Sequence, residues 1–215
     1  MRRGPVVFRA RDKMNINKIL PLLKESPYLT KQNLAVALGV SDDVLDYWIK
    51  KLINERYLIP LKKGFYIPSY YLDLVSQTAG EAYFEYLANL LCAPSYVSLE
   101  YVLSKANIIP EGVYAITSIT TKSSRTYTSD VATFIFKNIK DGLFFGFETK
   151  SFRGKRIKVA TPPKALFDFL YLKPTSWQEN SRINWDALEK RQKTEFKEIV
   201  KRSKSRKMAL IAAQL

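Results

Sequence analysis

The stretch "AVALGVSDDVLDYWIKKL", residues 35–52, has the spacing of two short helices joined by a tight turn. Gly39 can adopt the left-handed conformation that ends the first helix. Ala35 lets two helices cross closely, Val40 can fill the turn, and Ser41 can cap the second helix. Apolar residues then recur at i, i+3, i+4 and i+7, as Leu45, Trp48, Ile49 and Leu52. This pattern predicts a helix-turn-helix fold.

The flanking sequence extends this pattern on both sides. Residues 15–25 and 30–38 have helical spacing, and Thr30 is a favourable cap for the second of these helices. The third helix is expected to run from Ser41 to about residue 55. In "RYLIPLKKGFYIPS", residues 56–69, two apolar runs flank a Lys-Lys-Gly turn and predict a hairpin. The order predicts a winged helix-turn-helix DNA-binding domain over residues 14–70.

Candidate DNA contacts come from three basic elements of this domain. Burial of the apolar face of the third helix would turn the opposite face toward DNA, with Tyr47, Lys50, Lys51 and Asn54 on it. Lys62 and Lys63 at the hairpin tip suit phosphates or the minor groove. Residues 1–13 form a basic arm whose arginines suit the minor groove, namely Arg2, Arg3, Arg9 and Arg11.

Three acidic residues stand at the start of the same helix, where they would repel phosphate. Asp42 and Asp43 fit the first turn, because the helix dipole favours negative charge there. Asp46 could accept a hydrogen bond from a cytosine amino group, or it could keep the helix off DNA. The sequence leaves both interpretations open.

Composition narrows the classes of function. The chain has 215 residues and a formal net charge of +15, which favours nucleic acid as a partner. It has no histidine and one cysteine, Cys92, which excludes Ser-His-Asp and Cys-His catalysis and an internal disulfide. The same counts argue against a transition-metal site. We therefore expect no metal, no cofactor and no enzymatic activity.

The expected cellular location rests on the absence of membrane-span and secretory-signal patterns in the sequence. No apolar run reaches the ~18 residues of a membrane span. The first residues, "MRRGPVVFRARDK", have no long apolar segment of a secretory signal. We expect a cytoplasmic protein with no membrane partner.

The rest of the chain, residues 75–215, predicts a second domain of α+β class. Residues 73–92, a segment capped by Ser98, and residues 162–172 have helical patterns. Strands are expected near 113–121, 124–128, 132–138, 143–149 and 155–160, where Thr, Ile, Val, Phe and Tyr are frequent. A long charged helix at 184–203 ends the domain, and its basic residues either follow a nucleic-acid backbone or form a solvated face.

Two basic groups in this domain are candidate surfaces for phosphate binding or for antitoxin activity. Lys122 and Arg125 lie in a turn rich in Ser and Thr, where hydroxyls and cations can hold a phosphate. "RGKRIK" supplies the second group, Arg153, Lys155, Arg156 and Lys158.

Four segments in this order resemble the AbiEi family, the antitoxins of type IV (abortive-infection, AbiE) toxin–antitoxin systems. They are "PSYVSLE" at 94–100, "ITSITTK" at 116–122 with Arg125, "LFFGF" at 143–147 and "ATPPKALFDFLY" at 160–171. The resemblance covers residues 14–175. It implies a transcriptional autorepressor that binds inverted repeats of double-stranded DNA in its own promoter. It also implies an antitoxin that neutralises a nucleotidyltransferase-like toxin without a stable complex.

Three other functions remain as alternatives. One is a winged-helix regulator with a ligand-sensing C-terminal domain. Another is a Mg²⁺-dependent nuclease, in which Glu148 and Lys150 of "FETK" would act with Asp130 and Asp141. A module that binds only proteins is the third.

Overall fold

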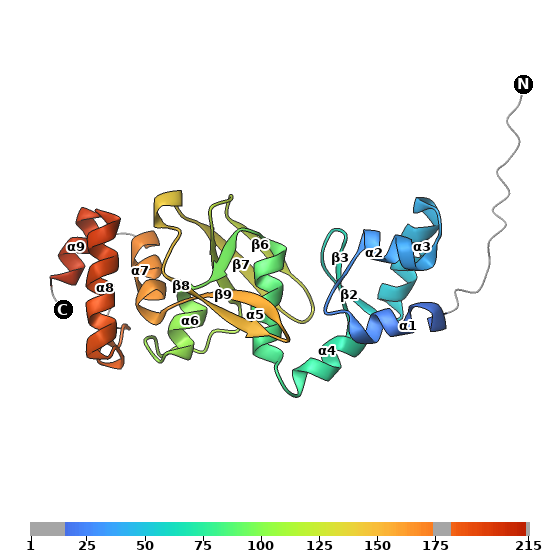
Figure 1. Cartoon of the computed structure of the whole chain (residues 1–215), viewed down its shortest axis with the longest axis horizontal. Helices are drawn as coiled ribbons and strands as arrows, with labels where there is room; N and C mark the ends of the chain where they lie inside the picture. The colour runs from blue at the N-terminus through green and yellow to red at the C-terminus, as the bar shows by residue number, and fades with distance from the viewer. Residues whose placement is uncertain (1–15, 174–181, 214–215) are drawn as a thin grey trace, which may run out of the picture. The chain divides into compact units, whose positions relative to one another are not determined.

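The computed structural model describes residues 16–173 and 182–213. The chain divides into two compact units, residues 1–74 and 75–215 (Figure 1). The predicted basic arm, with Arg2, Arg3, Arg9 and Arg11, lies outside the described residues.

The first unit consists of three helices and a small antiparallel sheet. The elements follow in the order α1 (Ile16–Glu25), β1 (Leu29–Thr30), α2 (Lys31–Leu38), α3 (Asp42–Asn54), β2 (Leu58–Lys62) and β3 (Phe65–Pro68). The strand order is β1-β3-β2, so the strand before α2 pairs with the second strand of the hairpin. The three helices and the hairpin fall where the sequence predicted them.

Local signals set the ends of α2. The Thr30 side chain accepts a hydrogen bond from the Asn33 backbone, and the Asn33 side chain accepts one from the Thr30 backbone. At the other end, Gly39 has φ +62° and donates its N–H to the Ala35 carbonyl at 2.9 Å. The predicted cap and left-handed turn are therefore both confirmed. Ser41 occupies the N-cap of α3, but its side chain makes no capping hydrogen bond.

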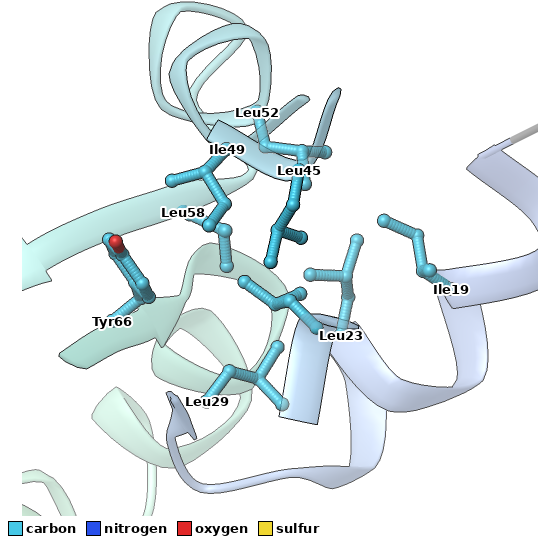
Figure 2. Close-up of a cluster of buried hydrophobic side chains, with 9 residues drawn as sticks. Ile19, Leu23, Leu29, Leu45, Ile49, Leu52, Leu58 and Tyr66 are labelled. Atoms are coloured by element: carbon cyan, nitrogen blue, oxygen red, sulfur yellow. The ribbon is translucent and has the colours of Figure 1, made fainter. Parts of the chain in front are cut away.

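The core of the first unit joins all of these elements. Figure 2 shows Leu45, Ile49 and Leu52 of α3 facing the side chains of α1 and β2. Each of these three leucine and isoleucine side chains is at most 4% exposed. Replacement of such a leucine by alanine costs about 2–5 kcal/mol of folding free energy. The rest of the buried cluster is Ile19, Leu23, Leu29, Leu34, Leu58 and Tyr66.

The second unit is built on a six-stranded mixed sheet with the order β6-β7-β5-β4-β9-β8. Neighbours β5 and β7 are parallel, as are β4 and β9, and the other pairs are antiparallel. The division between the units falls within α4 (Ser69–Ser76). The strands are β4 (Ser95–Val97), β5 (Ile116–Thr120), β6 (Arg125–Thr128), β7 (Thr133–Asn138), β8 (Phe147–Phe152) and β9 (Lys155–Ala160). The helices are α5 (Gly80–Leu91), α6 (Leu99–Lys105), α7 (Pro162–Leu172), α8 (Lys190–Ser203) and α9 (Arg206–Ala212), with 3₁₀ turns η1 (Asp141–Leu143) and η3 (Trp185–Ala187).

Helices cover both faces of this sheet. The Tyr96 hydroxyl of β4 reaches Asp168 of α7, so Ser95 and Val97 point to the opposite face, where α5 packs. The ring of Phe84 in α5 lies 6.4 Å from that of Phe134 in β7. Helix α6 packs against α7, and Figure 1 shows α8 and α9 on the side of α7 away from the sheet. Tyr96 is therefore enclosed between the sheet and α7.

The α+β class is confirmed, and three details were predicted wrongly. Residues 73–92 do not form one helix, because α4 ends at Ser76 and α5 begins at Gly80. The strand expected at 143–149 lies at 147–152 and follows η1. The short strands β1 and β4 had no signal in the sequence. No helix in residues 16–173 or 182–213 is long and apolar enough to cross a membrane.

Candidate nucleic-acid interface

Helix α3 presents a narrow polar stripe on the side opposite its buried residues. At 100° per residue, Asp43, Tyr47, Lys50 and Asn54 fall on one line along the helix. Tyr47 is 61% exposed, and Lys50 and Asn54 are also exposed. Within the described part of the chain, Lys50 and Asn54 have no hydrogen-bond or ion-pair partner. Their polar groups are available to a ligand.

Lys51 was predicted on the same outward face, but it lies on the flank of α3. Its Nζ is 5.1 Å from the ring centroid of the buried Trp48 and 3.7 Å from Glu55 Oε1. A lysine one residue after Lys50 is rotated by about 100° around the helix, which moves it off the stripe. Lys51 therefore lies at the edge of the stripe, beside Tyr47, with its ammonium directed to Trp48 and Glu55.

Asp46 forms an ion pair with a residue of another helix. Its Oδ1 lies 2.8 Å from Nζ of Lys31, the first residue of α2, and the two side chains are 59% and 39% exposed. The hydrogen bond that the Lys31 ammonium donates to Asp46 raises the pKa of Lys31. The negative charge of Asp46 is thus partly compensated, and the carboxylate lies toward α2 rather than on the outward stripe.

The β2–β3 hairpin is fixed beside the start of α2. Gly64 has φ +74°, and its carbonyl accepts a hydrogen bond from the Lys31 N–H at 3.0 Å. Lys63 is exposed at the tip, whereas the Lys62 ammonium lies 5.7 Å from the ring centroid of Phe65. The structure thus brings the hairpin tip, the start of α2 and α3 together in one unit.

Comparison with known proteins adds nothing to this geometry. No family model matches the chain, and no curated protein matches it. The family resemblance therefore rests on the four sequence segments alone.

The two basic groups of the second unit lie at one end of the sheet but on separate strands. The strand directions place Lys122, between β5 and β6, and Arg125, the first residue of β6, at the same end as the Arg153–Gly154 turn between β8 and β9. Strand β4 lies between β5 and β9. The Arg125 Nε donates to the Ser123 carbonyl at 3.1 Å. Lys122 is exposed.

The predicted "RGKRIK" surface is not one surface. Lys155 pairs with Phe152, whose ring contacts Tyr83 and Tyr86 of α5, so Lys155 projects on the α5 face. Arg156 and Lys158 alternate with it and project on the opposite face. There the Lys158 ammonium lies 5.2 Å from the ring centroid of Phe147. Because side chains alternate along a strand, these cations cannot all contact one phosphate group.

Three of the four segments that resemble AbiEi proteins meet at a buried polar network. Lys164 Nζ lies 2.5 Å from Asp168 Oδ1, and both side chains are fully buried. The hydroxyls of Tyr96 and Ser98 donate to Asp168 Oδ2 at 2.9 and 2.8 Å. Lys164 Nζ also donates to the Leu143 carbonyl at 2.9 Å. Burial raises the pKa of Asp168 and lowers that of Lys164.

This network joins residues that are far apart in the sequence. Lys164 and Asp168 are four residues apart on α7, a spacing that allows a local ion pair on a helix surface, but here the pair lies in the core. The hydroxyl of Tyr96, on β4, donates to the Asp168 carboxylate. Gly146, with φ +74°, leaves room for Lys164, because a Cβ there would lie 2.9 Å from Lys164 Cγ. The polar groups of these residues contact one another inside the second unit.

The structure does not bring Asp130 to the other residues of the proposed nuclease site. Glu148 and Lys150 lie on edge strand β8, whereas Asp130 lies in the turn after β6, the strand at the other edge. Over the described ranges there is no cluster of three or more Asp, Glu, His or Cys residues that could hold a metal ion.

A cavity of about 780 Å³ in the second unit is the candidate effector site for the ligand-sensing alternative. It lies between the loop after α6 and the residues around η3, and Ser104, Asn107, Glu111, Trp185 and Asp186 are among its lining residues. An ion pair between Arg182 Nε and Glu111 Oε1, 3.0 Å apart, adds charge to this wall. Small-molecule sites are mostly apolar with a few polar groups, whereas about half of the residues that line this cavity are polar or charged.

The charged C-terminal helix is α8, which begins at Lys190 rather than at the predicted residue 184, and α9 follows it. Phe196, Ile199 and Val200 are buried, and Lys190, Lys197 and Lys201 are exposed on the other side. Two basic residues, Arg202 of α8 and Lys207 of α9, have structural contacts. The Arg202 guanidinium lies 3.8 Å from the ring centroid of Phe145. Lys207 Nζ donates to the Leu170 carbonyl at 2.7 Å and to that of Lys173, which satisfies carbonyls at the end of α7.

Proposed function

We propose that the first unit is a winged helix-turn-helix that binds double-stranded DNA through the outward stripe of α3. The observation that carries this proposal is the stripe itself, since Tyr47, Lys50 and Asn54 are exposed while the opposite face is buried. The order α1-β1-α2-α3-β2-β3 and the exposed Lys63 at the hairpin tip support it. Lysines supply phosphate contacts, and an Asn amide can pair with adenine in the major groove.

The proposed biological role is that of an AbiEi antitoxin in the cytoplasm, which represses its own operon. The first unit would bind inverted repeats in the promoter. The second unit would oppose a nucleotidyltransferase-like toxin without forming a stable complex with it. The support for this half is the family resemblance, and three of its segments meet at the network around Asp168.

DNA binding is tested with the full chain and a duplex taken from directly upstream of its own gene. DNase I footprinting should show protection of two related half-sites. A scrambled duplex of equal length should bind at least tenfold more weakly, since specific binding exceeds non-specific binding by about 10³–10⁷. Equal affinity for the two duplexes would contradict sequence-specific repression.

Antitoxin activity needs a separate experiment. The chain is co-expressed with the product of the adjacent reading frame if that product arrests growth. Restored growth with the Lys50→Ala variant as well as with wild type would place neutralisation outside the DNA-binding surface. Arrest in the presence of wild-type protein would contradict the antitoxin role and leave the DNA-binding proposal intact.

A further inference from the structure

Asp46 differs from Asp43, a second acidic residue at the start of α3. Its carboxylate is paired with Lys31 at 2.8 Å. Asp43 lies on the outward stripe and, among the described residues, has no ion-pair partner. The two acids therefore have the same charge on the same helix but different surroundings.

Lys31 contacts both the β2–β3 hairpin turn and α3. It is the first residue of α2, and its N–H donates to the carbonyl of Gly64 in the hairpin turn. A Cβ on Gly64 would lie 3.9 Å from Lys31 Cβ, so the lysine side chain starts beside this turn. At its other end the ammonium contacts α3. Lys31 therefore lies between the two elements that are proposed to contact DNA.

We propose that Asp46 lowers the affinity of this surface for the DNA backbone by holding the Lys31 ammonium in an ion pair. The inference rests on the proposed DNA-binding function of the first unit. Both groups are partly exposed, so the pair is weak enough for its removal to free the lysine. A freed Lys31 would contact phosphate. Because phosphate contacts do not read sequence, Asp46 affects affinity for all duplexes equally.

The test compares Asp46→Asn with Asp43→Asn in the full chain. Fluorescence anisotropy measures Kd for the upstream duplex and for a scrambled duplex at several salt concentrations. Asp46→Asn should tighten binding to both by about three- to tenfold, and should steepen the slope of log K against log[salt] by about 0.9. The ratio of the two affinities should stay unchanged.

Lys31→Gln then identifies the cation that is responsible. As a single substitution, Lys31→Gln should weaken binding by less than about twofold, because Asp46 already pairs with the Lys31 ammonium in the wild-type protein. In the Asp46→Asn background it should abolish the gain. In the Asp43→Asn background it should again have little effect. This dependence on Lys31 separates a specific ion pair from the general removal of a negative charge.

Three results would overturn the inference. Asp46→Asn could weaken binding to the upstream duplex alone, which would assign Asp46 to base recognition. Lys31→Gln could weaken binding in the wild-type background as much as in the Asp46→Asn background, which would mean that Lys31 already contacts phosphate in the wild-type protein. Asp46→Asn could leave both affinities unchanged in a protein with the same unfolding temperature. Failure of wild-type protein to bind any duplex is a different result, because it removes the DNA-binding function itself.

Discussion

Lys164 and Asp168 form an ion pair 2.5 Å long from which solvent is excluded on all sides. Two hydroxyls, those of Tyr96 and Ser98, satisfy the second oxygen of the carboxylate. Such a pair adds little net stability over apolar residues of equal size, but loss of one member leaves a charge buried without its partner. The pair therefore holds β4, α7 and the segment before β8 in one arrangement.

Removal of the cation alone should destabilise the second unit strongly. Lys164→Met leaves the Asp168 carboxylate unpaired and should cost about 3–5 kcal/mol in the free energy of unfolding. Lys164→Met with Asp168→Asn removes the buried charge, and the amide oxygen can still accept from Tyr96 and Ser98. Urea denaturation of the full chain measures both, and the double variant should be the more stable one. A double variant that is less stable than Lys164→Met would contradict this role for the pair.

The destabilisation caused by Lys164→Met should depend on pH. Burial raises the pKa of Asp168, and without the ammonium that pKa rises further. An acid whose folded-state pKa exceeds its unfolded value of about 3.9 destabilises the protein above the folded-state pKa. That penalty disappears as pH falls toward the unfolded pKa. The stability gap between wild type and Lys164→Met should therefore shrink from pH 8 to pH 5, and a gap that widens over this range would exclude a buried carboxylate as the cause.

Among Gly146, Gly154 and Gly142, replacement of Gly146 by alanine should lower the stability of the protein most. Gly146→Ala combines positive φ with a contact to Lys164, so it should cost about 2–3 kcal/mol. Gly154→Ala has the same sign of φ but open space around it, and should cost about 1 kcal/mol. Gly142→Ala has neither problem and should be nearly neutral. Equal thermal shifts for Gly146→Ala and Gly154→Ala would mean that the lysine simply moves aside.

Sequence alone predicted the elements whose signals are local. Thr30 and Gly39 mark the ends of α2, and both act through neighbours within four residues. The partner of Asp46 is fifteen positions away on another helix, and no local pattern connects Lys31 to it. For Asp168 the spacing to Lys164 was visible, but its burial depends on Tyr96 and Ser98, which lie some seventy positions earlier. Tertiary packing decides such contacts, and hydrophobic periodicity does not report them.

The stripe on α3 also predicts which residues read bases. Asn54→Ala and Tyr47→Ala should lower affinity for the upstream duplex by about 5–150-fold each, equivalent to about 1–3 kcal/mol. Affinity for a scrambled duplex should change much less, since it depends on phosphates. Competition binding against both duplexes measures the ratio. If both variants weaken the two duplexes equally, Tyr47 and Asn54 contact the backbone and sequence is read elsewhere.

The outward position of Lys50 is the basis of the proposed function, and its salt dependence tests it most directly. Binding of the full chain to its upstream duplex is measured between 50 and 200 mM salt for wild type, Lys50→Ala and Lys18→Ala, where Lys18 is an exposed lysine of α1. Lys50→Ala should weaken binding and flatten the slope of log K against log[salt] by about 0.9, as loss of one phosphate contact requires. Lys51→Ala should have a smaller effect, because its ammonium is near Trp48 and Glu55. If Lys50→Ala binds with the affinity and slope of Lys18→Ala, the outward face of α3 does not contact DNA.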